Sequence, residues 1–138
     1  MRDIEHHQPE EMNGNGEGYF HELDLVVDGK KIGKAELFYR NSPFPFYYLS
    51  WIDINPEKRG AGHGKIFLAA INRFLDSKGK SGILTNSIHA ESPAHSMYQN
   101  NGWQEIPNHQ GWYIYNSPKN LFPDRVDKAI YEIKQMME

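Results

Sequence analysis

The sequence predicts an α+β fold in which a mixed, mostly antiparallel sheet is flanked by helices. Three patterns predict it: two alternating segments joined by a turn signal, a helical stripe after a third strand-like segment, and a second stripe near the carboxyl end. At 138 residues the chain is long enough for one hydrophobic core and short for two. We therefore expect a single domain.

The strands of the amino-terminal half follow from period-two patterns. Residues 19–27 alternate apolar and polar side chains, Asp28 and Gly29 supply a hairpin turn signal, and residues 32–39 form the return strand. Two prolines then interrupt the pattern, and residues 46–54, rich in aromatic and β-branched side chains, predict a third strand.

Residues 1–18 are polar and acidic and contain little that a core could bury. Such a segment predicts a mobile polar leader, ahead of a single domain over residues 19–138.

The carboxyl half predicts three helices and three strands. Residues 63–77 carry an apolar stripe at helical spacing, which should lie against the sheet. We further expect a strand at 82–88, a helix from Ser92 and Pro93 onward, and two closing strands at 103–106 and 111–115. An amphipathic helix at 121–137 should dock on the core.

Composition excludes several classes of protein. A formal net charge of -3 gives no electrostatic footprint for nucleic acid, and the absence of cysteine removes thiolate nucleophiles and disulfides. No apolar stretch is long enough to span a membrane and residues 1–18 lack a signal-peptide core, so we expect a cytoplasmic protein with no membrane partner. The seven histidines lack the spacing and the carboxylate partner of a zinc enzyme, so no metal is expected.

A glycine-rich loop, residues 54–65, joins the third strand to the first helix. Its alternating glycines let successive backbone N–H groups point at anionic oxygens where a helix begins. The spacing does not fit a P-loop, which would need glycine and a hydroxyl where Arg59 and Ile66 stand. It does not fit a dinucleotide fingerprint, which would need glycine at Lys65. The loop therefore predicts a diphosphate cradle of another kind.

The string R-x-x-G-x-G over residues 59–64, preceded by hydrophobic-x-Pro, resembles the coenzyme A loop of the GNAT superfamily of N-acyltransferases. A second block, residues 94–103, resembles the A-x-x-L-Y-x-x-x-G-F motif of that family. The two blocks occur in the order of the family, separated by one helix and one strand. The resemblance covers about residues 19–116 and implies a GNAT-like acyl-CoA N-acyltransferase core.

One departure from the family is large. Its usual opening strand and pair of helices, which help to wall the acceptor site, have no counterpart in an 18-residue polar leader. The fold is therefore expected to lack the usual N-terminal helices. The acceptor pocket would be open, or completed by residues 40–45, by the carboxyl-terminal helix or by a second subunit of a homodimer.

The resemblance assigns coenzyme contacts to two segments. Main-chain groups of Ile52, Asp53 and Ile54 would pair with the pantetheine arm of acetyl-CoA, while the side chains of Ile52 and Ile54 are read as core. The pyrophosphate would lie on the loop residues Arg59, Gly60, Ala61, Gly62, His63, Gly64 and Lys65. An alternative for Arg59 and Lys65 is a solvated surface pair.

Tyr98 matches the family's proton donor to the departing thiolate, although its spacing also fits an ordinary packed aromatic residue. Many family members carry an acid where this chain has Ser50, and a serine can at most help to hold a water. Glu91, where the family often has asparagine, and His89 are candidate bases by position, or members of a solvated loop.

These features together predict an N-acetyltransferase that moves an acetyl group directly from acetyl-CoA to the amine of a small molecule or peptide. An acidic balance favours a cationic amine. The alternative is a catalytically inactive acyl-CoA-binding sensor or protein-interaction module on the same fold. It is favoured by three departures from the family pattern: Ser50, Glu91 and the absence of the usual N-terminal helices.

Overall fold

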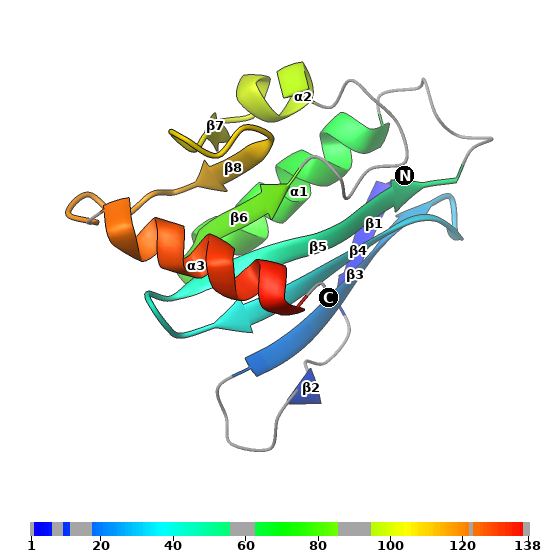
Figure 1. The fold of residues 1–138 in the computed structure, drawn as a ribbon. Coiled ribbons are helices and arrows are strands. Elements are labelled where there is room, and N and C mark those ends of the chain that lie inside the picture. The colour runs from blue at the N-terminus through cyan, green and yellow to red at the C-terminus, as the bar shows by residue number, and fades with distance from the viewer. Residues whose placement is uncertain are drawn as a thin grey trace.

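The computed structural model describes residues 2–6, 10–11, 18–55, 63–85, 95–121 and 123–136. Over these ranges one mixed sheet is flanked by helices, which confirms the predicted α+β class (Figure 1). The elements are β1 Arg2–His6, β2 Glu10–Glu11, β3 Gly18–Val27, β4 Lys30–Arg40, β5 Phe46–Ile54, α1 His63–Lys78, β6 Ser81–Thr85, α2 His95–Asn100, β7 Gln104–Glu105, β8 Trp112–Tyr115 and α3 Pro123–Met136.

The strands are ordered β1-β3-β4-β5-β6-β8-β7 in the described part of the chain, and β2 also pairs with β3. β5 and β6 run parallel, whereas the other paired strands are antiparallel. The predicted hairpin turn between β3 and β4 is present, with positive φ at Asp28 (51°) and Gly29 (79°). Such a two-residue turn matches the twist of the strands it joins.

The amino-terminal segment differs from the expected leader. Residues 2–6 form β1, which pairs with residues 23–27 of β3, and β2 pairs with residues 19–20. A strand without an apolar face can still join the edge of a sheet through main-chain hydrogen bonds. Amino-acid composition does not indicate this kind of pairing. Residues 2–6 and 10–11 are therefore paired strands, which the polar composition did not predict, while residues 7–9 and 12–17 lie outside the described ranges.

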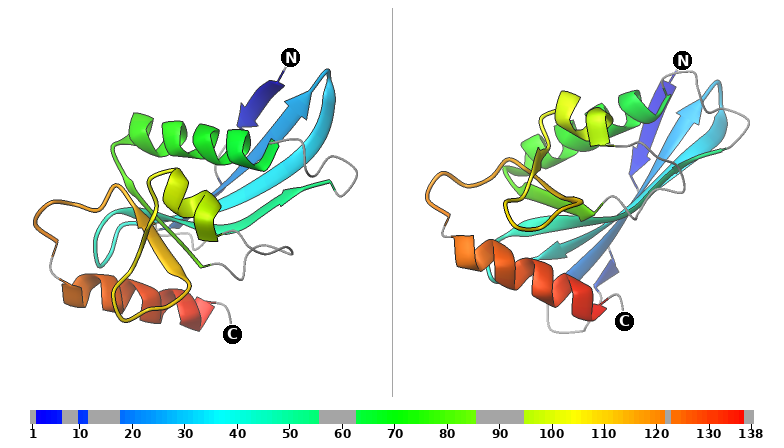
Figure 2. Two further views of the ribbon diagram at one scale, coloured as in Figure 1. Left: turned by 90° about the horizontal axis from the view of Figure 1, so that it is seen from above. Right: turned by 45° about the horizontal axis from the view of Figure 1, so that its top comes forward.

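The helices α1 and α3 cover opposite faces of the sheet (Figure 2). On one face, α1 packs its predicted stripe against β3, β4 and β5, and the α1-side core contains Phe67, Leu68, Ile71, Leu25, Leu37 and Leu49. On the other face, α3 covers only part of the sheet, and the α3-side core contains Ala129, Ile130, Ile133, Phe46, Tyr48, Ile83 and Trp112. Burial of each large apolar side chain stabilises the fold by about 1.5–3 kcal/mol.

The carboxyl-terminal helix docks as predicted, through Ala129, Ile130 and Ile133, whereas Met136 is 42% exposed. The strand expected at 82–88 is described as far as Thr85, and the second helix is described from His95 onward. None of the helices in the described ranges has the length and apolarity to cross a bilayer.

Candidate functional site

The sheet splits between its two parallel strands. β5 pairs with β6 at only three positions, Phe46 to Tyr48 opposite residues 81–83. On its other edge, β5 pairs with β4 as far as Ile54. The strand therefore continues for six residues, 49–54, beyond its pairing with β6, and Figure 1 shows the two strands separating along this stretch.

A β-bulge lies at the start of the split. Leu49 is opposite Leu37 and Trp51 is opposite Glu36, so Ser50 is an extra residue in β5. The Ser50 hydroxyl donates a hydrogen bond to the backbone oxygen of Glu36 at 3.2 Å. A bulge bends its strand and re-aims the side chains that follow it.

The bulge changes which residues of β5 face α1. Leu49 before it, and Ile52 and Ile54 after it, all belong to the α1-side core. Since neighbouring side chains along a strand alternate, Trp51 and Asp53 lie on the opposite face. Trp51 is 38% exposed, whereas the other residues of β5 are buried or half-buried.

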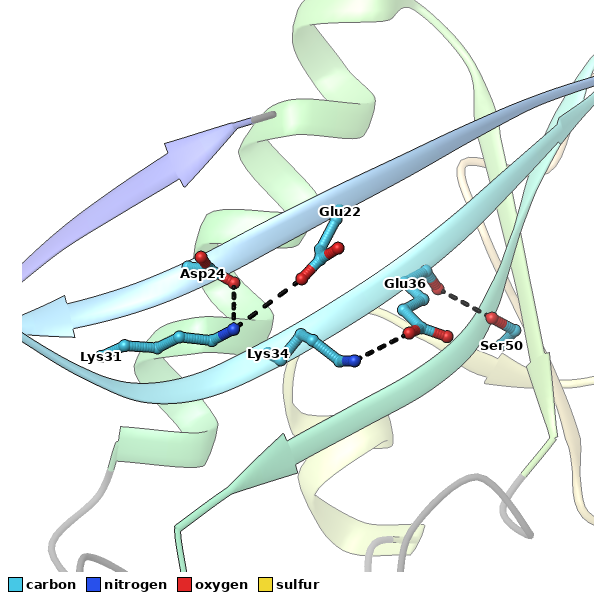
Figure 3. A network of polar contacts seen from close by, with 6 residues as sticks. All are labelled: Glu22, Asp24, Lys31, Lys34, Glu36 and Ser50. Carbon is cyan, nitrogen blue, oxygen red and sulfur yellow. Dashed lines mark hydrogen bonds and ion pairs between the residues drawn. The ribbon is translucent and has the colours of Figure 1, made fainter. Parts of the chain in front are cut away.

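A network of charges from β3 and β4 is drawn in Figure 3. It lies on the same face as Trp51, because the residues that alternate with these charges along β3 and β4 belong to the α1-side core: Leu23, Leu25, Ile32, Ala35 and Leu37. Lys31 Nζ lies 3.2 Å from Asp24 Oδ1 and 3.8 Å from Glu22 Oε1, and Lys34 Nζ lies 3.0 Å from Glu36 Oε1. The hydrogen bond and the charge of Glu36, with smaller contributions from Glu22 and Asp24, raise the pKa of Lys34. These carboxylates therefore stabilise the charged form of Lys34.

The first turn of α1 lies beside α2. A β-carbon added to Gly64 would lie 3.8 Å from Met97 Sδ, which is ordinary van der Waals contact. The first turn of α1 has no acidic side chain, so no carboxylate of that turn offsets the partial positive charge at the start of the helix. The last turn contains Lys78. Lys65, in that first turn, is exposed.

Tyr98 on α2 is fully buried. Its ring centroid lies 5.1 Å from that of Tyr113 and 6.5 Å from that of Trp103, within the α1-side core. Burial, with a smaller effect of Tyr113, raises the pKa of Tyr98 well above its usual value. The hydroxyl therefore keeps its proton at neutral pH.

A hydrogen-bond network fixes the end of α2 against α1. The Trp103 backbone N–H donates to Tyr98 O at 3.0 Å, and the Trp103 indole N–H donates to Asn72 Oδ1 at 2.7 Å. Asn72 Nδ2 in turn donates to Asn101 O at 2.8 Å. The turn requires Gly102, which has a φ of 86°.

Sequence reasoning missed Asn72, Glu36 and Trp51. Asn72 is a polar residue of α1 that does not belong to the apolar stripe, so nothing in the sequence marked it as buried. Glu36 and Trp51 gave no signal, because their proximity depends on the register between β4 and β5.

The other predicted site residues fall into two groups. Ile52 and Ile54 are buried, as expected for their side chains, and Asp53 is half-buried; all three lie on β5 beyond the split. Outside the described ranges lie the loop residues Arg59, Gly60, Ala61 and Gly62 and the candidate bases His89 and Glu91. Among the described residues, no three potential metal ligands cluster.

No protein-family model and no curated protein matches the sequence. Solved structures do match. The ribosomal-protein-S18-alanine N-acetyltransferase of Escherichia coli aligns over 75% of this chain and 74% of its own, with 19% identity and a TM-score of 0.54. The PaiA N-acetyltransferase of Thermoplasma acidophilum, solved with coenzyme A, aligns over 69% and 58%, with 23% identity and a TM-score of 0.53.

An acetyltransferase assigned to the GNAT family from Desulfovibrio desulfuricans aligns over 70% of this chain, with 20% identity and a TM-score of 0.53. The alignment spans 66% of that Desulfovibrio chain, slightly less than two thirds of its length. At these identities the similarities establish the fold: the chain has the GNAT acyltransferase fold, as the motif resemblance predicted.

Proposed function

We propose that this chain, whose fold is that of the GNAT acyltransferases, is an N-acetyltransferase that moves an acetyl group directly from acetyl-CoA to an amine. The observation that carries the proposal is the split between β5 and β6 beyond Tyr48, with the bulge at Ser50 at its start. A split sheet offers a strand edge, and amide groups of a bound molecule can pair with such an edge as another strand would.

The residues present fit acetyl-CoA as cosubstrate. Main-chain groups of Ile52, Asp53 and Ile54 lie on the stretch of β5 beyond the split, where they would hold the pantetheine arm. The start of α1, with no carboxylate in its first turn, favours an anion, and the proposal gives the pyrophosphate to residues 59–65. No metal is required, because the leaving thiolate needs a proton and no Lewis acid.

Tyr98 is the proposed general acid. Its raised pKa keeps the hydroxyl protonated, which is the state needed to donate a proton to the sulfur as the thioester C–S bond breaks. Its helix begins beside the first turn of α1, so the proposed anion site and the proposed acid belong to neighbouring elements. In the preceding step the amine nitrogen adds to the acetyl carbonyl carbon and loses its proton to a base or water, and the resulting tetrahedral intermediate expels the thiolate that takes the Tyr98 proton.

Ser50 is proposed to position the bulge. Its hydroxyl proton is used in the bond to Glu36 O, while its oxygen can still accept a hydrogen bond from a water. It therefore supports the site through the backbone of β5 and through water, not as a base.

The acceptor side is proposed to be walled by α3 and the loop before β5. Phe44 of that loop belongs to the α3-side core, and Arg40 lies 3.9 Å from Glu132 Oε2 and donates to Met136 Sδ at 3.3 Å. The carboxyl-terminal helix would thus help to close the acceptor side of the site. A homodimer would add a second wall, which gel filtration with light scattering tests.

Calorimetry with acetyl-CoA tests the coenzyme assignment. The wild type should bind, and a double variant with Arg59→Ala and Gly62→Asp should not, because it removes one cation and adds an anion to the proposed cradle. Lys119→Ala, on an exposed segment after β8, is the matched control and should bind as the wild type does. A folded wild type that does not bind would contradict the proposal.

A second candidate function is a catalytically inactive acyl-CoA-binding sensor or interaction module. The full burial of Tyr98 and the serine at the bulge favour it, since neither offers an exposed acid or base in this conformation. A panel of small amines and peptides separates the two functions. Acetyl-CoA binding with acetylation supports the enzyme, and binding without acetylation of any amine supports the sensor.

A further inference from the structure

Trp51 is exposed in a strand that is otherwise mostly buried. It keeps 38% of its surface accessible, whereas Leu49 and Ile52, on either side of the bulge, are 0% and 1% exposed. Because of the bulge at Ser50, its side chain lies on the sheet face opposite α1, directly after the point where β5 and β6 separate. An indole therefore borders the split on the face that α1 does not cover.

A carboxylate stands beside this indole. Glu36 is the register partner of Trp51 across β4 and β5, and its neighbours Ala35 and Leu37 belong to the α1-side core, which places Glu36 and Trp51 on the same face. Directly opposed side chains on one face have β-carbons about 4.5–5.5 Å apart. An indole face together with a carboxylate is the combination that attracts an organic cation in water.

The surroundings have a negative charge balance. Near Trp51 the sheet carries Glu22, Asp24, Glu36 and Asp53 against Lys31 and Lys34, four formal negative charges against two positive ones. The pKa of Lys34 is raised mainly by Glu36 and also by Glu22 and Asp24, which is what a negative local potential does to an ammonium group.

We propose that Trp51 and Glu36 bind a positively charged group of the acceptor, so that the substrates are amines carrying a second cation. The inference rests on the proposed acetyl transfer at this site and names its substrate class. A reacting amine has a reference pKa of about 10.4 and must lose its proton before it attacks. The nitrogen that reacts cannot remain as the cation held by Trp51 and Glu36, so a second ammonium group has to occupy that position.

The arrangement of the two faces supports this placement. The proposed coenzyme cradle is at the start of α1, on the face where Leu49, Ile52 and Ile54 pack. Trp51 and Glu36 lie on the other face. Direct transfer requires both substrates to meet at the split, and the two faces let them approach from opposite sides.

A binding experiment tests the cation site independently of catalysis. The probes are 1,5-diaminopentane and its neutral analogue 1,5-pentanediol, titrated at low salt into ¹⁵N-labelled protein while the indole N–H signals of the three tryptophans are followed. We expect the diamine to shift the Trp51 signal and to bind at least about tenfold more tightly than the diol. Trp51→Leu identifies that signal by its loss.

Two variants and two controls locate the site. Trp51→Leu and Glu36→Gln, followed through backbone amide signals, should each weaken diamine binding about tenfold, which corresponds to about 1.4 kcal/mol. Tyr131→Leu and Asp124→Asn change an exposed aromatic residue and an exposed acid on α3 and should bind as the wild type does. Equal binding of diamine and diol, no binding of the diamine, or undiminished binding by both site variants would overturn the inference.

Turnover on the same samples separates this inference from the proposed function. The kcat/KM for 1,5-diaminopentane should exceed that for pentylamine about tenfold, and Trp51→Leu or Glu36→Gln should remove the difference through KM. Equal acetylation of both amines would support the acetyltransferase and overturn the substrate class. Diamine binding at Trp51 with no acetylation would uphold the cation site and count against the enzyme.

Discussion

The indole N–H of Trp103 donates a 2.7 Å hydrogen bond to Asn72 Oδ1, joining the segment after α2 to the middle of α1. Asn72 uses its amide as well, donating to Asn101 O at 2.8 Å. One side chain of α1 therefore satisfies two polar groups beside the helix that carries Tyr98. Trp103 is 1% exposed, so its N–H has no route to bulk water.

Asn72→Ala should lower the free energy of unfolding by about 2–4 kcal/mol, because it leaves both of these groups without their partner. Urea denaturation followed by far-UV circular dichroism measures the change. Gln99→Ala, on the exposed side of α2, is the matched control and should stay within about 0.5 kcal/mol of the wild type. A small effect of Asn72→Ala, similar to that of the control, would mean that α2 is held by its apolar contacts alone.

Tyr98→Phe should lower kcat about 100-fold and leave the Kd for acetyl-CoA nearly unchanged, because it removes the proton donor and keeps the ring that packs on Trp103 and Tyr113. Steady-state kinetics and calorimetry give the two quantities. Tyr131→Phe, on exposed α3, is the control for losing a phenol elsewhere. An undiminished kcat would remove Tyr98 from the mechanism.

The raised pKa of Tyr98 also predicts the alkaline side of the rate profile. A group whose pKa is raised keeps its proton as the pH rises, so the proposed acid should not be lost below about pH 10. Over the same range the amine substrate loses its proton. We therefore expect kcat/KM to rise with pH up to about pH 10, and a decline that begins near neutral pH would contradict the assignment.

Tyr48 predicts alkaline destabilisation of the fold. Burial raises its pKa from 10.0 to about 12, so between these values an unfolded chain has released this proton while the folded chain retains it. Because the unfolded state then binds fewer protons, the free energy of unfolding falls with rising pH, by up to about 1.4 kcal/mol per pH unit for this residue. The loss begins near pH 10 and ends above pH 12.

Urea denaturation of the wild type and of Tyr48→Phe between pH 8 and pH 11 tests this dependence. The variant should lose less stability over the interval than the wild type does. Tyr131→Phe should follow the wild type, because Tyr131 is 64% exposed. Parallel curves for wild type and Tyr48→Phe would show that Tyr48 ionises equally in both states.

The sequence predicted those strands and helices whose apolar residues recur at a regular spacing along the chain. The third strand was expected at residues 46–54 and β5 has those bounds, and α1 extends one residue beyond the expected 63–77. Both segments carry enough apolar residues to reveal their period. The edge strand β1 could not be predicted in this way, because its pairing with β3 uses main-chain groups that every sequence has.

The candidate site was predictable only in part, for the same reason. The local strings that drew attention to Tyr98 and to the loop before α1 are contiguous in the sequence. The bulge at Ser50 depends on where Leu37 and Glu36 of β4 meet β5, which is a property of the register and not of either strand alone. The exposure of Trp51 and its proximity to Glu36 follow from that register, so the sequence alone could not predict them either.

Lys34→Gln should strengthen binding of 1,5-diaminopentane about two- to fivefold. The Lys34 ammonium lies 3.0 Å from Glu36 Oε1 and competes with any other cation for that carboxylate. The side chain of Lys34 is 36% exposed, and exposed ion pairs contribute only about 0–1 kcal/mol, so losing this pair should cost the fold little. NMR titration gives the Kd, and Lys119→Gln, a charge change on an exposed segment away from β4, is the control. Weaker binding by Lys34→Gln would mean that the lysine supports the cation site by holding Glu36 in place, and the competition described here would be wrong.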